Sequence, residues 1–320
     1  MQRVFVTGGS GFIGTHVARQ LEERDINWIN YDIKAPISNE FQDRWIAGDI
    51  RDAQHLAAAL HDYEPTCILH LAARTDTHSD ELCDYDSNTT GTFNLVEAVR
   101  GLDSRPRLVF TSTQFVSRPG NPTDDPLRFN PHTTYGTSKV VGEVAVRCGL
   151  PEEQWVIVRP TNIWGPWHPR YGTEFWRVLD RGLYVHPSGR DATRTYGYVG
   201  NVAKQMVSAL LLPPNEVTGQ VFYLGEDPIP LSQWVDAFSV AIRGRPARRF
   251  SRSAMKLGAK GGDVLQSMRL RSPLTSARFR SMTEDYVTPV SRTHRVLGSG
   301  DISLDRGVAE SVAWYREVCR

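Results

Sequence analysis

A glycine-rich turn between a short apolar strand and a helix restricts what this chain can fold into. The run Val4–Thr7 has the composition of a buried strand, and a helical stretch starts directly after the turn that follows it. Two spacings, G-x-x-G-x-x-G and G-x-G-x-x-G, fit its glycines Gly8, Gly9, Gly11 and Gly14. Either one gives a tight turn, a backbone that can approach a pyrophosphate, and a helix N-terminus facing that charge. We therefore predict a dinucleotide-binding strand–turn–helix.

Strand-like runs alternate with helical stretches through the first half of the chain. The strands are expected at 4–7, 28–31, 45–47, 67–71, 107–111 and 155–158, and the helices at 13–24, 53–61, 88–100 and 136–147. Such alternation is typical of βαβ units, which build a parallel sheet covered by helices on both faces. The predicted fold class is α/β, a doubly wound parallel sheet of Rossmann type.

The amino-acid composition changes after Arg159-Pro160, where Pro, Gly and aromatic residues become frequent. A helix–strand pair at 201–212 and 221–224 is expected to return to the sheet, while 245–285 gives the weakest structural signal and a last helix is expected at about 305–318. We therefore predict a dinucleotide-binding domain of residues 1–160 plus about 198–225. A smaller, discontinuous C-terminal substrate domain comprises 161–197 and about 226–320.

The overall composition excludes several classes of protein. The net charge is +1, from 37 basic and 36 acidic residues, which predicts neither a nucleic-acid-binding field nor a polybasic membrane patch. No apolar run approaches the roughly 20 residues that span a bilayer, and no signal-peptide pattern opens the chain. The scattered Cys67, Cys83, Cys148 and Cys319 indicate reduced thiols rather than a metal site. A soluble cytoplasmic protein without a bound metal is expected.

An acidic residue follows the second predicted strand. Asp32 lies 18 residues after Gly14, where a carboxylate hydrogen-bonds the adenosine ribose and repels a 2′-phosphate, so NAD is predicted rather than NADP. Further cofactor-binding residues are expected in the glycine turn and at the ends of later strands: Gly8, Gly11, Phe12, Ile13, Gly14, Asp49, Ile50, Leu71, Ala72 and Ala73.

A tyrosine and a lysine stand four residues apart at the start of the helical stretch 136–147. That spacing places Tyr135 and Lys139 on one helix face, one turn apart. A tyrosine with its ordinary pKa of about 10 is a poor base near neutrality. The Lys139 ammonium, together with a positively charged nicotinamide ring, is expected to favour the phenolate and to lower this pKa.

Taken together, the motifs resemble those of the extended short-chain dehydrogenases, and within them the NAD-dependent epimerase/dehydratase family. The resemblance rests on Thr7–Gly14, Asp49-Ile50, His70–Ala73, Asn88-x-x-Gly91-Thr-x-Asn94, Thr111-Ser-Thr113, Tyr135-x-x-x-Lys139 and Arg159–Pro166. It implies that a Ser/Thr hydroxyl and Tyr135 share one substrate hydroxyl, while Lys139 holds the cofactor ribose. Thr111, Tyr135 and Lys139 are accordingly expected to contact NAD as well.

The catalytic hydroxyl is assigned by position within this resemblance. In the family it lies four residues before a Tyr-Gly pair, which Ser117-Arg118 replaces here, so Thr113 takes that position and Ser112 is the competing candidate. Relatives that eliminate water carry Asp-Glu after this Thr, and decarboxylating ones carry a Glu two residues after it. This chain has Gln114 and Phe115, which cannot exchange a proton near neutral pH.

The reactions that remain need only Thr113, Tyr135, Lys139 and NAD. The leading hypothesis is an NAD-dependent epimerase of a nucleotide sugar, at C4. The alternative is a dehydrogenase or keto-reductase of a nucleotide sugar or another bulky alcohol such as a sterol. A 4,6-dehydratase, a decarboxylase and a non-catalytic nucleotide sensor are weaker alternatives.

The resemblance also implies substrate-binding residues and an oligomeric state. Asn162 and Arg194 stand where relatives bind the sugar or its diphosphate, and Arg280 lies where relatives carry another phosphate-binding Arg. A homodimer is expected through the helices at 88–100 and 136–147. The other expected partner is the small-molecule substrate, with neither nucleic acid nor membrane.

Overall fold

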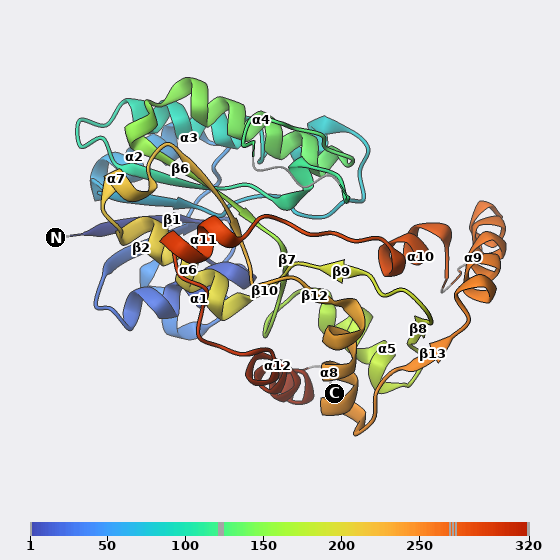
Figure 1. Cartoon of the computed structure of the whole chain (residues 1–320). Helices are drawn as coiled ribbons and strands as arrows, with labels where there is room; N and C mark the ends of the chain where they lie inside the picture. Colours follow the sequence, from blue (N-terminus) through green and yellow to red (C-terminus); the bar gives the residue numbers. More distant parts are fainter. Residues whose placement is uncertain (1, 121–124, 269, 271, 273, 319–320) are drawn as a thin grey trace. The chain divides into compact units, whose positions relative to one another are not determined.

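A parallel seven-stranded sheet is the centre of the first of two units into which the chain divides (Figure 1). The computed structural model describes residues 2–120, 125–268, 270, 272 and 274–318. The strands in sheet order are β11 (Gln220–Leu224), β6 (Trp155–Pro160), β5 (Arg107–Thr111), β4 (Cys67–His70), β1 (Arg3–Thr7), β2 (Asn27–Asp32) and β3 (Trp45–Ala47). Every neighbouring pair is parallel. The order reverses between β1 and β4, which confirms the doubly wound fold and marks the position where such sheets bind ligands.

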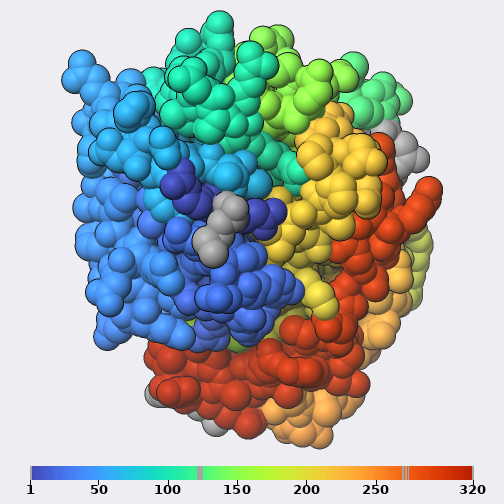
Figure 2. All heavy atoms as spheres, turned by 90° about the vertical axis from the view of Figure 1, so that its left-hand side faces the viewer, coloured from blue at the N-terminus to red at the C-terminus, as the bar shows by residue number. Residues whose placement is uncertain are grey.

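Helices cover both faces of this sheet. On one face α1 (Phe12–Glu22) packs against α6 (Val199–Leu211). On the other, α2 (Ala53–Tyr63), α3 (Thr90–Arg100) and α4 (Thr134–Gly149) pack side by side. The atoms of the first hundred residues, blue to cyan, form one continuous surface in Figure 2. Between the sheet and α2–α4 lies an apolar core that includes Phe5, Tyr31, Leu56, Ile68, Leu95, Phe110, Val146 and Ile157.

The first unit comprises residues 1–163, 197–226 and 289–301, and the second comprises 164–196, 227–288 and 302–320. Our expected division had assigned all of about 226–320 to the substrate domain. In the structure residues 289–301 belong instead to the first unit, because α11 (Ser291–Val296) packs against the edge strand β11. There Thr293 donates its hydroxyl proton to the Tyr223 carbonyl, 2.6 Å away.

The second unit is built around aromatic side chains. Its elements are a π-helical turn (Tyr171–Trp176), α5 (Arg177–Asp180), β8 (Val185–Pro187), β9 (Thr193–Arg194), β12 (Ile229–Pro230), α8 (Leu231–Arg243), β13 (Arg248–Phe250), α9 (Arg252–Ser267), α10 (Ser276–Thr283) and α12 (Leu304–Val318). Trp164, Trp176 and Phe238 are fully buried, and Trp234 is 3% exposed. Of the aromatic residues that follow Pro160, Trp164 and Trp176 are therefore core residues, while Trp167, Tyr171 and Phe175 are half-buried.

Short elements complete the chain. They are the 3₁₀ turns at Asn39–Arg44, Leu82–Tyr85, Gln114–Val116 and Glu152–Gln154, the short helix α7 (Pro214–Val217), and the strands β7 (Asn162–Trp164) and β10 (Tyr196–Tyr198). The region 245–285, which gave the weakest sequence signal, contains β13, α9 and α10. One of its glycines has a packing role, since a Cβ on Gly262 would lie 1.8 Å from the Leu274 carbonyl oxygen.

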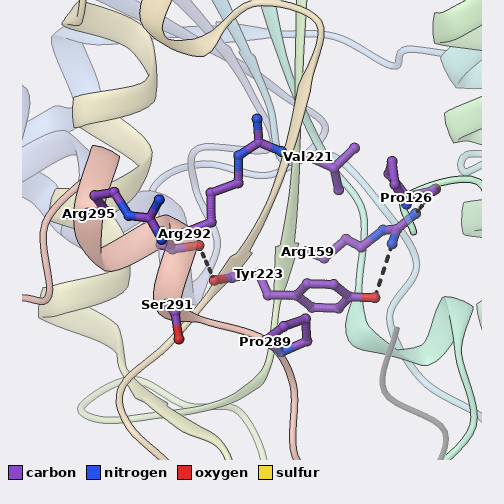
Figure 3. A pocket seen from close by; sticks show the side chains of 9 residues that line it. Pro126, Arg159, Val221, Tyr223, Pro289, Ser291, Arg292 and Arg295 are labelled. Atoms are coloured by element: carbon purple, nitrogen blue, oxygen red, sulfur yellow. Dashed lines mark hydrogen bonds between the residues drawn. The ribbon is translucent and has the colours of Figure 1, made fainter. Parts of the chain in front are cut away.

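A buried ion pair connects the sheet to α4. Arg159 on β6 donates from Nε and Nη2 to the two carboxylate oxygens of Glu143, both at 2.8 Å, and neither side chain is exposed. Arg159 also donates to the Tyr223 hydroxyl on β11 at 3.0 Å and to the Pro126 carbonyl at 2.8 Å (Figure 3). The pair thus joins two strands, a helix and a loop through one guanidinium group.

Removing one member of this pair is expected to destabilise the protein strongly. Glu143→Gln leaves the Arg159 charge buried without its counter-ion, at a cost of about 3–5 kcal/mol in free energy of unfolding, measured by urea denaturation. The matched control is Glu97→Gln, which removes an exposed pair with Arg100 and should change stability little. Equal effects of the two variants would contradict this prediction.

Candidate active site

The glycine turn between β1 and α1 is shaped by the chain's own packing at two positions. Gly8 has a φ of +73°, and a Cβ there would lie 2.4 Å from the backbone nitrogen of Ala72. A Cβ on Gly14 would lie 2.4 Å from the Gly9 carbonyl oxygen. These two glycines are needed for the turn itself, because a side chain at either position would collide with backbone.

Gly11 differs, because the protein gives no packing reason for a glycine there. Its φ of −83° suits any residue, it is exposed, and the nearest atom to an added Cβ is the Gly8 carbonyl oxygen at 3.6 Å. Gly11 is also the N-cap of α1, where unpaired backbone N–H groups favour an anion. The open space fits a pyrophosphate that approaches the backbone closely.

Two side chains of β2 hold the turn in place. Asn30 accepts from the Gly9 backbone N–H at 2.8 Å, and Asp32 accepts from those of Ser10 and Lys34 at 3.0 Å each. Asp32 is half-buried, and each carboxylate oxygen retains a lone pair for a ribose hydroxyl. Sequence reasoning identified Asp32 but missed Asn30, which lies two residues earlier on the same face of the strand.

The other expected cofactor residues surround this turn with different degrees of exposure. Phe12, Ile13, Leu71, Ala72 and Ala73 are half-buried at the carboxyl ends of β1 and β4. Ile50 is 5% exposed and its side chain belongs to the core, so only its backbone is available to a ligand. Asp49 is held by the Arg51 guanidinium, whose hydrogen bonds keep the pKa of that carboxyl below its usual value.

Tyr135 and Lys139 lie in the first turns of α4, as their spacing predicted. Thr133 caps this helix by accepting from the Gly136 backbone N–H at 2.9 Å, which fixes the position of Tyr135. Tyr135 is 8% and Lys139 2% exposed. Glu143 lies one turn beyond Lys139, so three ionisable side chains at four-residue spacing occupy one buried face of the helix.

The expected lowering of the Tyr135 pKa does not come from the chain itself. Burial raises the pKa of Tyr135 to about 12, although its hydrogen bond with the Thr113 side chain lowers it. Burial likewise lowers the pKa of Lys139 to about 8, while Glu143 acts in the opposite direction. The Lys139 ammonium lies 4.7 Å from the centre of the Phe110 ring. Desolvation therefore outweighs the effect that we had expected of Lys139 on the tyrosine.

Three hydroxyl residues, Thr111, Ser112 and Thr113, stand at the end of β5, and Thr113 contacts Tyr135. Thr113 is 6% exposed and forms the hydrogen bond with Tyr135, whereas Ser112 is anchored through its backbone N–H, 2.7 Å from the Val158 carbonyl. The buried hydroxyls of Thr111 and Ser112 have no partner among the residues that the structure describes. Such orphaned groups fit a ligand that supplies the missing hydrogen bonds.

Gln114 and Phe115 stand at the two positions where the family resemblance implies a carboxylate in dehydratases and decarboxylases. Gln114 donates from Nε2 to the Asn162 Oδ1 at 3.0 Å, so it orients a residue expected to bind substrate. Phe115 packs at 6.0 Å from the Tyr135 ring and stacks on His132 at 5.4 Å, both between ring centres. Tyr85, which sequence reasoning missed, is fully buried with its ring 6.3 Å from that of Tyr135.

The remaining expected substrate residues belong to the second unit. Arg194 on β9 is half-buried and donates to the Ser281 carbonyl, and Arg280 on α10 is exposed. A separate cavity of about 520 Å³ in the first unit is lined by Pro126, Arg159, Val221, Tyr223, Pro289, Ser291, Arg292, Thr293 and Arg295 (Figure 3). None of the expected site residues lines this cavity.

Two further observations concern the described part of the chain only. No group of three or more His, Cys, Asp or Glu side chains in it is arranged to hold a metal ion. None of its helices has the length and apolarity required to cross a bilayer. Cys67, Cys83 and Cys148 are free thiols, and Cys319 lies outside the described residues.

Comparison with known proteins matches residues 4–225 to the model of the NAD dependent epimerase/dehydratase family. A 3-beta-hydroxysteroid dehydrogenase of Mycolicibacterium neoaurum is 26% identical and covers 99% of this chain and 92% of its own. A UDP-glucose 4-epimerase of Mycolicibacterium smegmatis is 29% identical and covers 65% of this chain and 72% of its own. The structure of a Thermus thermophilus UDP-glucose 4-epimerase with NAD has a TM-score of 0.74 at 23% identity, covering 99% of this chain and 100% of that one.

The two kinds of glycine in the turn should respond differently to substitution. Gly11→Ala is expected to leave the free energy of unfolding within about 1 kcal/mol of the wild type, yet to raise the NAD dissociation constant at least about tenfold. Gly8→Ala, strained at φ +73° and against Ala72, is expected to lower stability by more than about 2 kcal/mol. Calorimetric titration measures the NAD dissociation constant of each variant, and urea denaturation measures its free energy of unfolding. A Gly11→Ala protein with wild-type NAD affinity would contradict the assigned pyrophosphate site.

Replacing Lys139 should stabilise the protein while abolishing turnover. Because burial lowers its pKa to about 8, the folded protein binds this proton less tightly than the unfolded chain. Stability contributed by Lys139 therefore rises with pH between about 8 and about 10.5. Lys139→Met should be about 1–3 kcal/mol more stable than the wild type at pH 7, with the difference shrinking towards pH 10.5. Urea unfolding across this range tests it, and a constant difference would contradict it.

Proposed function

Because the chain belongs to the NAD-dependent epimerase/dehydratase family, we propose that it is an epimerase of a nucleotide sugar, acting at C4. The observation that carries the proposal is the buried pair of Thr113 and Tyr135, joined by a hydrogen bond at the carboxyl end of β5. Lys139 lies one turn further along α4, and no carboxylate stands at positions 114 and 115. This set is sufficient to oxidise a secondary alcohol and does not provide an acid for elimination.

NAD supplies the hydride acceptor when bound. The glycine turn at Gly11 and the N-terminus of α1 would hold its pyrophosphate, and Asp32 its adenosine ribose. Lys139, buried one helical turn from Tyr135, would contact the nicotinamide ribose. A 2′-phosphate would meet the Asp32 carboxylate, so NAD is favoured over NADP.

In the proposed reaction Thr113 and Tyr135 both hydrogen-bond the substrate hydroxyl. Tyr135, as phenolate, takes the hydroxyl proton while the hydride leaves the same carbon, and a ketone results. With its pKa near 12 from burial, Tyr135 needs an additional positive charge to ionise. Return of the hydride to the opposite face of the ketone, and of the proton from Tyr135, completes epimerisation with no net oxidation.

Gln114 supports this choice over dehydration or decarboxylation. Its amide neither takes up nor releases a proton near neutrality, and it is engaged in the hydrogen bond with Asn162. We propose that Asn162 binds the sugar or the diphosphate, and that Arg194 and Arg280 bind phosphate oxygens through their guanidinium groups.

A second candidate is net dehydrogenation of a bulky apolar alcohol. It is favoured by the M. neoaurum relative, named a 3-beta-hydroxysteroid dehydrogenase, because its alignment covers nearly the whole of this chain. Thr113, Tyr135 and Lys139 would have the same roles in this reaction. The ketone would be released as product instead of rotating in the site to accept the hydride on its other face. The two candidates differ in whether NADH accumulates.

Dimerisation remains a proposal as well. Phe93 on α3 and Val144 on α4 are 49% and 45% exposed, so both helices present large apolar side chains outward. A four-helix interface of two copies of α3 and α4 would cover them. A cytoplasmic location is likewise proposed, since the thiols of Cys67, Cys83 and Cys148 are free, as is typical of a reducing compartment.

Removing the phenol should abolish turnover without removing the cofactor. Tyr135→Phe is expected to lower kcat at least about 100-fold, since general-base catalysis contributes that much, while the NAD dissociation constant stays close to the wild-type value. Tyr85→Phe is the matched control, because it removes a neighbouring hydroxyl that donates to the Asp76 and Ser79 carbonyls. A fully active Tyr135→Phe enzyme would overturn the assigned base.

The same protein distinguishes the two candidate functions. With UDP-glucose or another nucleotide hexose, proton NMR should reveal the C4 epimer with no change in absorbance of NADH. With 3β-hydroxysteroids and added NAD, stoichiometric NADH formation would favour the dehydrogenase instead. Absence of both reactions across nucleotide sugars and hydroxysteroids would count against the proposal.

A further inference from the structure

The charge of the chain is distributed very unevenly. Residues 243–280 contain 11 of its 37 basic residues and one of its 36 acidic residues, so this stretch carries +10 and the remainder −9. The single acid, Asp263, is already occupied, since it accepts from the Ser276 backbone N–H at 2.9 Å. The near-neutral net charge, from which we expected no polybasic patch, is therefore an average over two regions of opposite sign.

The helix α9 within this stretch uses one face to pack in its own unit. Met255 and Ala259 are 6% and 1% exposed and form an apolar cluster with Phe279 of α10. Gly262, on the same face, allows close contact with Leu274. Figure 1 draws α9 in orange next to α10. This face accounts for the attachment of α9 to its unit.

A second apolar face of α9 is exposed to water. Leu257, Val264 and Met268 are 73%, 60% and 66% exposed, and their spacing of seven and four residues places them in one stripe. Phe250, Leu265 and Leu270 beside them are also exposed, at 55%, 42% and 55%. Packing within the unit does not explain six large exposed side chains in this one region.

Two lysines border this stripe. Lys256 and Lys260 are exposed, lie one turn apart, and have no ion-pair partner in the part of the chain that the structure describes. Their long stems can lie along apolar surface while the ammonium groups reach an anionic layer above it. We call the exposed side chains of Phe250, Lys256, Leu257, Lys260, Val264, Leu265, Met268 and Leu270 the α9 surface.

We propose that the α9 surface docks on an anionic lipid bilayer. Lys256 and Lys260, with arginines of the stretch 243–280, would bind headgroup phosphates. The stripe of Leu257, Val264 and Met268 would enter the boundary between headgroups and acyl chains. Charge complementarity selects this occupant. A second copy of the same surface would set its two lysines against the two lysines of the partner across a two-fold interface. A nucleic acid would use the positive charges but gives no role to the exposed Leu, Val and Met side chains. The proposal is independent of the substrate of the enzyme.

The test is co-sedimentation of the full chain with vesicles. The protein should bind vesicles of phosphatidylcholine mixed with phosphatidylglycerol, and this binding should weaken as salt is raised. It should bind phosphatidylcholine vesicles far less. Equal binding to both kinds of vesicle, or no binding to either, would overturn the proposal without any variant being needed.

Two double variants separate the contributions of charge and apolar surface. Lys256→Gln/Lys260→Gln should weaken binding by about fivefold for each lysine, and Leu257→Ser/Val264→Ser should weaken it as well. Arg24→Gln/Arg100→Gln and Val240→Ser are the matched controls, since they remove exposed charges and an exposed apolar side chain elsewhere and should leave binding unchanged. Circular dichroism and NAD affinity verify that each variant is folded.

Other outcomes would point to other occupants and overturn the proposal. Binding of duplex DNA that competes with vesicles and is insensitive to Leu257→Ser/Val264→Ser would indicate a polyanion site. A shift of the wild type to a larger species in gel filtration that Leu257→Ser/Val264→Ser abolishes would indicate a second copy of this chain.

Discussion

The buried contact between Arg159 and Glu143 is the interaction on which the geometry of the site depends. It connects β6 to α4 inside the protein, and through Tyr223 it extends to β11. Tyr135, Lys139 and Glu143 follow one another at four-residue spacing on α4, so fixing Glu143 fixes the rotation of the helix that presents the other two. A buried ion pair is stable only with good hydrogen-bond geometry. The Arg159–Glu143 pair therefore also restricts where α4 places Tyr135 and Lys139.

Burial is the physical condition that Tyr135, Lys139 and the neighbouring His70 share. It raises the pKa of Tyr135, lowers that of Lys139, and lowers that of His70, which hydrogen-bonds Thr7 beneath the turn, to about 3. Each shift favours the neutral form, although Lys139 with a pKa of about 8 still carries most of its charge at pH 7. Because desolvation opposes ionisation of Tyr135, a positively charged dinucleotide ring beside it would favour the phenolate and so proton abstraction.

The sequence could predict those residues whose role depends on local spacing. The glycine turn lies between β1 and α1, Asp32 ends β2, and Tyr135 and Lys139 share the first turns of α4. The alternation of strands and helices predicted the doubly wound sheet. It could not predict Asn30, Tyr85 or the Glu143–Arg159 pair, because their partners are distant in sequence. Nor did it indicate α9, since Gly258, Gly261 and Gly262 obscure the helical pattern from 252 to 267.

By itself, the sequence determined the fold class, the family, the cofactor and the absence of an acid at positions 114 and 115. These follow from short-range patterns and from residue chemistry, which a chain carries before it folds. Only the tertiary structure decided that Gly8 and Gly14 serve packing while Gly11 leaves open space, and that desolvation outweighs the lysine at Tyr135. It also decided which apolar residues of α9 stay exposed. Burial and contact across the chain are properties of the folded molecule, so no local pattern contains them.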